Sequence, residues 1–184
     1  MYGRKRLRTG ARGALFFTVL ILLFGQVSCG RRIGDGTLSL LSSALDAEVT
    51  VETGDITYRA TLRLGGVDAE TGTRDGEISF LSPESVAGMR ILEREGAVTL
   101  SYGKKDVPLT GDAPEKLLLP LRLLSGGDVT AREGGIENGL PVVYVTLSDG
   151  RVLTLGGEDG ALLAVKRGDV TLRVSWIESR REGE

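Results

Sequence analysis

The chain has no histidine and only one cysteine among its 184 residues. Without histidine it cannot form Ser-His or Cys-His nucleophile pairs, and it lacks a frequent zinc ligand and the commonest general base. A single cysteine excludes a disulfide within the chain, so stability must come from a hydrophobic core. The glycine pairs do not precede Lys-Ser or Lys-Thr at phosphate-loop spacing. We therefore expect a protein that is not an enzyme and that holds no metal and no cofactor.

Positive charge is scarce beyond the N-terminal segment. Five of the 23 basic residues precede Cys29, which leaves 18 basic against 25 acidic residues and a net charge of about −7. Binding to nucleic acid needs a clustered positive face, so a nucleic-acid partner is disfavoured. The same acidity disfavours electrostatic adhesion to anionic lipid. Attachment to a membrane would therefore come through acyl chains.

Residues 1–28 have the layout of a signal peptide. A basic segment with five Arg or Lys residues and no acid is followed by an apolar run over 14–24 and by small residues ahead of Cys29. The run is shorter than the roughly 20 apolar residues of a transmembrane helix. We predict a bacterial lipoprotein that is cut before Cys29 and acylated there, with palmitate among its acyl chains, on the extracytoplasmic face of the cell membrane.

Two other fates of this segment remain open. The residues before Cys29 resemble a lipobox, but Gln26 stands where lipoproteins usually carry Leu or another aliphatic residue. An ordinary signal peptidase that used Ser28 and Gly30 as its small-x-small site would discard the cysteine. Alternatively, the segment would stay uncleaved as a marginal anchor.

The remaining chain is long enough for one domain with a sizeable core. We expect a flexible tether over 29–36, a single domain over 37–178 and a charged tail over 179–184. Apolar residues spaced three and four apart predict an amphipathic helix near 37–46, with Thr37 as its N-cap.

Further along, the apolar residues alternate with a period of two, which predicts short strands. The expected strands are 48–52, 56–64, 76–81, 89–95, 98–102, 128–132, 140–147, 151–155, 161–166 and 171–177. Asp149-Gly150 marks a tight hairpin, and Trp176 is expected in the core because it alternates with Leu172 and Val174. Few helices separate the strands, so an antiparallel meander is favoured over a parallel sheet.

A leucine cluster over 117–124 interrupts the strands. Asp112 and Pro114 are typical of a helix start, and Pro120 should kink or split the helix because it has no amide hydrogen to donate. Two short helical turns lying on the sheet are the expected product.

The order of these elements resembles the lipoprotein carriers of the LolA and LolB type and related lipid-binding envelope lipoproteins. The resemblance is most specific in residues 76–91 (GEISFLSPESVAGMRI), where a strand ends in a Pro-containing segment and turns directly into the next strand. It implies a mainly β (α+β) fold, in which a strongly curved antiparallel sheet or half-barrel of about 9–11 strands carries an N-terminal helix and a short central helical insertion on its concave side.

The resemblance also implies a function: a membrane-anchored lipoprotein that binds or carries an amphiphile, such as a lipid or an acylated protein, on its concave face. The residues expected to line that face are Ile78, Phe80, Ile91, Leu100, Leu117, Leu121 and Leu124. The alternative is an envelope scaffold or interaction lipoprotein whose sheet is filled by its own side chains, since alternating aliphatic residues are what any half-buried strand requires. A cavity deep enough for an acyl chain would separate the two.

Overall fold

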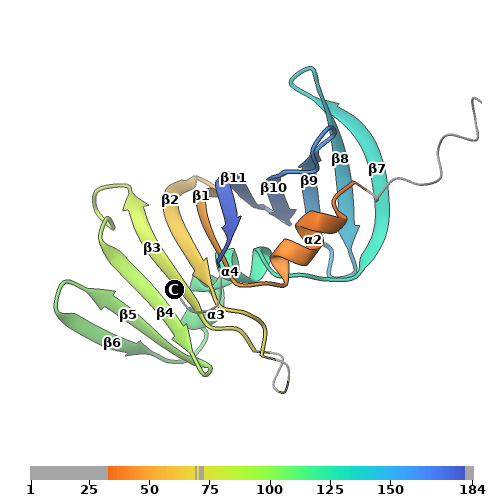
Figure 1. Cartoon of the computed structure of the whole chain (residues 1–184). Helices are drawn as coiled ribbons and strands as arrows, with labels where there is room; N and C mark the ends of the chain where they lie inside the picture. The colour runs from red at the N-terminus through yellow and green to blue at the C-terminus, as the bar shows by residue number, and fades with distance from the viewer. Residues whose placement is uncertain (1–32, 69, 71–72, 181–184) are drawn as a thin grey trace, which may run out of the picture. The chain divides into compact units, whose positions relative to one another are not determined.

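Eleven strands form one antiparallel sheet in the computed structural model, which describes residues 33–68, 70 and 73–180 (Figure 1). The strand order is β6-β5-β4-β3-β2-β1-β11-β10-β9-β8-β7. The strands are β1 (Leu45–Thr53), β2 (Ile56–Leu64), β3 (Gly76–Ser82), β4 (Met89–Arg94), β5 (Ala97–Tyr102), β6 (Lys105–Leu109), β7 (Val129–Glu137), β8 (Leu140–Leu147), β9 (Val152–Gly156), β10 (Leu162–Arg167) and β11 (Val170–Ser179). The predicted signal peptide, Cys29, the first part of the expected tether and the last four residues of the expected tail lie outside the described residues.

The sheet is curved and not closed, which confirms the expected half-barrel. Each strand pairs with its neighbours in sequence, except β6 and β7, which lie at opposite edges of the sheet. In addition, β1 pairs with β11 and so joins the two halves. The edge strands β6 and β7 are linked by the short helices α3 (Ala113–Leu117) and α4 (Leu119–Leu123), which cross the concave side. The helix α2 (Asp35–Leu41) lies on the same side (Figure 1).

The N-terminal helix is shorter than expected and begins earlier. Its N-cap is Gly34, whose φ of 93° falls in the left-handed region that glycine adopts without a steric cost. Thr37 is therefore not the N-cap: it lies inside the helix, and its hydroxyl donates a hydrogen bond to the carbonyl oxygen of Gly160 at 2.5 Å. The helix ends at Leu41, which is fully buried.

The helical interruption is split, as Pro120 predicted. The break falls at Leu118, two residues before the proline, because Pro120 has no amide hydrogen to continue the hydrogen bonds of α3 and is well tolerated in the first turn of α4. Leu118, Leu121, Leu123 and Leu124 are buried. They join residues of β1–β5 and β8–β11 in one hydrophobic core on the concave side.

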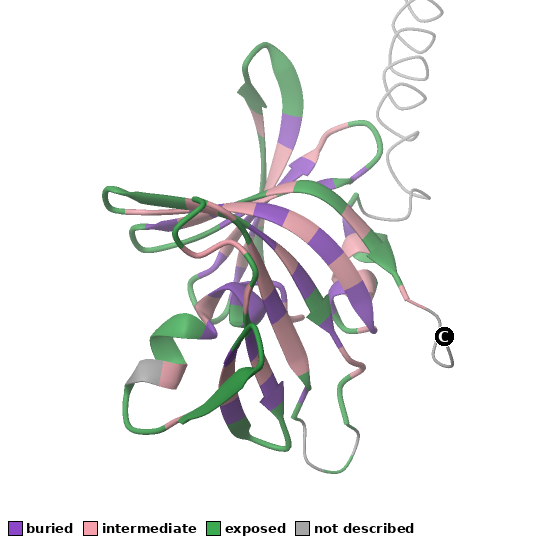
Figure 2. Cartoon of the chain, turned by 90° about the vertical axis from the view of Figure 1, so that its left-hand side faces the viewer, coloured by how far each residue is buried: buried purple, intermediate pink, exposed green. Residues whose placement is uncertain are grey.

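Burial alternates along the strands, as Figure 2 shows by its bands of buried and partly buried residues. In β1 every second residue from Leu45 to Val51 is buried, as expected for a sheet that buries one face. The outer face carries charged cross-strand pairs, among them Arg173 with Glu52 at 3.0 Å and Arg63 with Asp46 at 3.4 Å. Such exposed pairs contribute little to stability, and they keep this face in water.

Trp176 is not in the core, contrary to the expectation from its alternation with Leu172 and Val174. The pairing of β11 with β1 shifts between Glu48 and Val49, so that Val174 faces Val49 whereas Trp176 faces Glu48. This β-bulge turns Trp176 to the outer face, where its exposed fraction is 42%. Ile177 takes the inward position and packs against the core.

Candidate ligand-binding face

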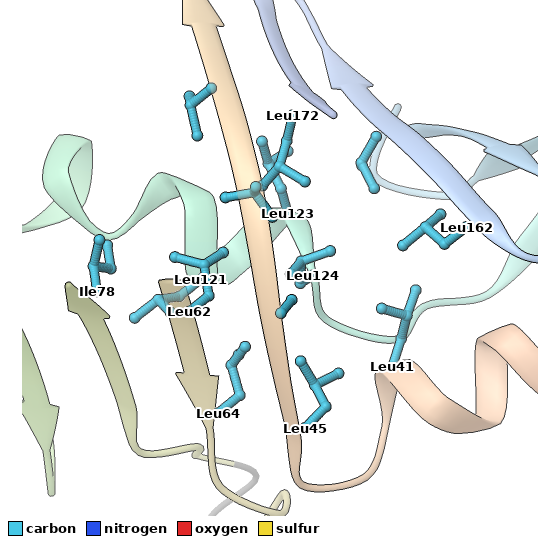
Figure 3. Packing of buried hydrophobic residues seen from close by; sticks show 14 of the residues in the cluster. Leu41, Leu45, Leu62, Leu64, Ile78, Leu121, Leu123, Leu124, Leu162 and Leu172 are labelled. Carbon is cyan, nitrogen blue, oxygen red and sulfur yellow. The ribbon is translucent and has the colours of Figure 1, made fainter. Parts of the chain in front are cut away.

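The two central helices cover one half of the concave face. Leu121 and Leu123 of α4 point into the sheet, where Leu121 lies beside Leu62 of β2 (Figure 3). Helix α4 lies close to β3. A Cβ atom added at Gly76 would be only 2.6 Å from Cδ1 of Leu121. This half of the concave face is filled by the protein's own side chains.

A buried arginine, Arg74, fixes both helical segments to the sheet. Its Nε donates a hydrogen bond to the carbonyl oxygen of Gly65 at 2.6 Å, and its Nη1 donates to the carbonyl oxygens of Leu41 at 2.9 Å and Leu124 at 3.2 Å. Its Nη2 donates to the carbonyl oxygen of Ser43. Burial lowers the pKa of Arg74 to about 10, because a charge is costly to remove from water. Its partners are the ends of α2 and α4.

A second buried arginine, Arg151, holds the chain that leaves α4. Its Nη1 donates to the carbonyl oxygens of Leu123 at 3.0 Å and Ser125 at 2.6 Å, and its Nη2 donates to that of Gly126 at 2.9 Å. Its Nε pairs with Asp149 at 2.7 Å. Burial alone would raise the pKa of Asp149, but the hydrogen bonds and charge of Arg151 outweigh burial and lower it.

The other half of the concave face is not covered by the helices, and we call it the open half. It comprises Ile56, Tyr58, Phe80, Leu100, Tyr102 and Val107, which the strand registers place on the same face as core residues. Ile56 is 63% exposed, Tyr102 60% and Val107 52%.

Tyr58 and Phe80 form the inner wall of the open half, with ring centroids 5.3 Å apart and planes tilted by 50°. Both are half-buried against the core. Burial raises the pKa of Tyr58 to about 12, since the phenolate would lose its hydration there. The tyrosine therefore stays neutral at physiological pH and presents an aromatic surface.

The residues expected from the sequence to line a ligand site are divided between the two halves. Four of them are buried in the core: Ile78 and Ile91 of the sheet, Leu121 of α4, and Leu124 at the end of α4. Phe80 and Leu100 belong to the open half, and Leu117 is 38% exposed on α3.

Sequence reasoning missed Arg74, Arg151 and Glu93, which are all buried. The signal that could have found them is weak, because single charged residues next to glycine-rich turns usually lie in solvent. The β-hairpin signal Asp149-Gly150 predicted the turn but not that the following arginine would reach inward.

Two cavities lie apart from the open half, one on each face of the sheet. One of about 290 Å³ lies at the end of the concave face remote from the open half, and its walls include Leu64, Arg74, Glu93, Leu121 and Arg122. Another of about 520 Å³ lies on the outer face of β3–β6 among polar side chains such as Glu77, Arg90 and Lys104.

In the described part of the chain no three His, Cys, Asp or Glu side chains come together as metal ligands would. None of the described helices has the length and apolar composition to cross a membrane.

No protein-family model and no curated protein matches the chain. Similar solved structures include one titled as MucB, with 14% identity and a TM-score of 0.44 over 82% of this chain; the chain spans 60% of the length of that structure.

Two further structures are covered over most of their length. A putative outer membrane lipoprotein-sorting protein domain from Vibrio parahaemolyticus has 13% identity and a TM-score of 0.43, covering 82% of this chain and 95% of that one. A LolA superfamily protein from Nitrosomonas europaea has 11% identity and a TM-score of 0.38, covering 81% and 94%. Likeness at this level concerns the course of the chain alone.

Proposed function

We propose that the protein is a membrane-anchored lipoprotein that binds the acyl part of an amphiphile, a lipid or an acylated protein, on its open half. The observation that carries the proposal is the open half itself: six apolar or aromatic side chains lie on one face, continuous with the core but not covered by the helices. Contiguous exposed apolar surface of this kind marks a binding site more often than isolated exposed residues do.

Aliphatic and aromatic walls suit an acyl chain because the attraction needs no directional partner. Each buried methylene contributes roughly 0.8 kcal/mol. Eight methylenes would then contribute about 6 kcal/mol before the costs of association, which is enough for measurable binding. The neutral Tyr58 adds a polar tip to an apolar ring, which is suited to the boundary between an acyl chain and its head group.

The anchor proposed at Cys29 would keep one edge of the sheet near the membrane. Arg132 of β7 donates to the carbonyl oxygen of Ile33 at 2.6 Å and pairs with Asp35 at 2.6 Å. Four residues of extended chain span at most about 14 Å, so the acylated cysteine would stay within that distance of Ile33. The β7–β8 hairpin next to this point ends in Ile136 and Leu140, exposed by 76% and 67%.

The test of amphiphile binding compares two exposed positions of the sheet. Val107→Asp places a charge in the open half, whereas Thr57→Asp places one on the outer face, where Thr57 pairs with Glu52 and is exposed. Because both sites are exposed, both variants should fold. A fluorescent fatty acid should bind the wild type and Thr57→Asp alike, and Val107→Asp should bind it at least about tenfold more weakly, since a carboxylate against an acyl chain costs more than 1.4 kcal/mol. Equal binding by all three would contradict the proposal.

The burial of four of the expected residues favours a second function, the envelope scaffold. Ile78, Ile91, Leu121 and Leu124 are part of the hydrophobic core and do not line the open half. A scaffold would bind its partner through loops or edge strands and would show no affinity for fatty acids in any of the three proteins.

A further inference from the structure

The cavity of about 290 Å³ beside α4, which we call the Glu93 cavity, lies at the opposite end of the concave face from the open half. It is walled by the end of β2 at Leu64, the start of β3 at Gly76, Glu93 of β4, and Leu121 and Arg122 of α4. The open half lies at the opposite ends of β2, β3 and β4. The cavity is therefore a separate site, and the inference drawn from it does not depend on the proposed function.

Glu93 is a buried carboxylate with one satisfied and one unsatisfied oxygen. Its side chain is 9% exposed, so it is more than nine-tenths buried. Its Oε1 accepts a hydrogen bond from Nη2 of Arg122. Its Oε2 is buried and has no hydrogen-bond partner among the described residues. A buried charged acceptor left without a donor is costly, so the site requires a donor that the described side chains do not supply.

The charges around the cavity indicate which kind of donor fits. Arg122 already balances Glu93, and the wall carries one further charge of each sign, Arg74 and Asp75. An ammonium ligand would leave an uncompensated positive charge in a partly enclosed space, and a carboxylate ligand would face the lone pairs of Oε2. A neutral donor, such as a hydroxyl group, keeps the charges balanced and meets no repulsion.

The walls also indicate what the donor is attached to. Leu64 and Leu121 are almost fully buried and border the cavity on two sides. Gly76 and Gly96 add no side chain to its lining. We propose that the Glu93 cavity binds a neutral alcohol with a short alkyl group, whose hydroxyl donates a hydrogen bond to Oε2 of Glu93 while the alkyl carbons contact Leu64 and Leu121.

The experiment is a titration of the full chain with 1-hexanol, hexylammonium and hexanoate at pH 7, followed by calorimetry and by methyl NMR of the leucines. We expect 1-hexanol to bind at least about tenfold more tightly than hexanoate, which has no hydrogen to donate to Oε2 at pH 7, and more tightly than hexylammonium, whose charge must be removed from water. The methyl signals of Leu64 and Leu121 should shift during that titration. Equal affinity for the three probes, or leucine methyl signals that do not move, would overturn the proposal.

The variant Glu93→Gln tests the carboxylate itself. It keeps the shape of the side chain but turns one acceptor into a donor, so 1-hexanol should bind about tenfold more weakly. Glu77→Gln is the matched control, because Glu77 also faces an arginine, Arg90 at 3.9 Å, but on the outer face of the sheet; its affinity for 1-hexanol should equal that of the wild type. Unchanged affinity in Glu93→Gln would mean that the alcohol does not meet Glu93. If Glu93→Gln does not fold, the leucine methyl shifts in the wild type decide.

Discussion

The guanidinium of Arg151 donates a hydrogen bond from Nη1 to the carbonyl oxygen of Leu123 at 3.0 Å. This contact joins the start of β9 to the end of α4, the helix that fills the covered half of the concave face. Arg74, which precedes β3, makes the corresponding contact to Leu124. The position of α4 on the concave face thus depends on two buried cations that satisfy the carbonyl groups at a helix end.

Arg151→Met should destabilise the domain by about 2–4 kcal/mol, because it removes the donors of several buried carbonyl oxygens while keeping much of the side-chain volume. Urea unfolding followed by circular dichroism measures the change. Arg173→Met is the control: Arg173 pairs with Glu52 in an exposed position of the outer face, so its loss should cost less than about 1 kcal/mol. Similar losses in the two variants would show that Arg151 does not hold α4.

Gly76→Ala should cost about 1–3 kcal/mol, because the added methyl group would lie 2.6 Å from Cδ1 of Leu121 and force that buried side chain to shift. The double variant Gly76→Ala with Leu121→Ala should be more stable than the sum of the two single changes predicts, since the smaller side chain makes room. Additive free energies of unfolding in this double-mutant cycle would mean that α4 does not pack on β3 in this way.

Leu121→Asp should lower the free energy of unfolding by several kcal/mol, since Leu121 is 2% exposed and the carboxylate would be buried without a partner. Thermal unfolding is the measurement. A variant with the melting temperature of the wild type would place Leu121 at the surface of a ligand site instead of in the core.

Tyr58 should ionise only at high pH, with a pKa of about 12 against an ordinary value of 10. A pKa that is raised in the folded state gives stability that is fully present below pH 10 and is lost as the pH rises towards 12, because the unfolded chain releases the proton first. The loss is at most about 2.7 kcal/mol and is reduced where the ring meets water. Comparison of wild type and Tyr58→Phe isolates this effect from the opposing one of Arg74, whose pKa is lowered. Parallel stability curves between pH 9 and 12 would contradict it.

Cys29→Ser should move the protein from the detergent phase to the soluble fraction in a bacterium that lipidates exported proteins. In the wild type the mature chain should begin at Cys29 and carry acyl chains. If the variant stays with the membrane, an uncleaved N-terminal segment is the anchor.

Clear alternation of apolar and polar residues in the sequence predicted the bounds of two strands. The strands at 56–64 and 140–147 have the predicted bounds, because alternation between two turn signals fixes both ends. The strand β6 was missed, since Lys104-Lys105 and Pro108 are unusual in a strand and are tolerated here at an edge of the sheet. The bulge that turns Trp176 outward depends on pairing with β1, about 130 residues earlier, and no local pattern records it.

The candidate site was predictable only in part. The alternation placed Phe80 and Leu100 on the concave face, but it could not show that α4 would cover Ile78 and Ile91 and leave the other two partly exposed. That division depends on the path of the connection between the two edge strands. It also depends on where Arg74 and Arg151 reach inward, which is a property of the folded chain.

The central claim is that the open half holds an amphiphile, and the most direct measurement is organic extraction of the purified full chain followed by mass spectrometry. We predict an acylated compound in near-stoichiometric amount from the wild type and from Thr57→Asp, and much less from Val107→Asp. Extracts of the wild type that contain no acylated compound above the amount found with Val107→Asp would contradict the claim and favour the scaffold.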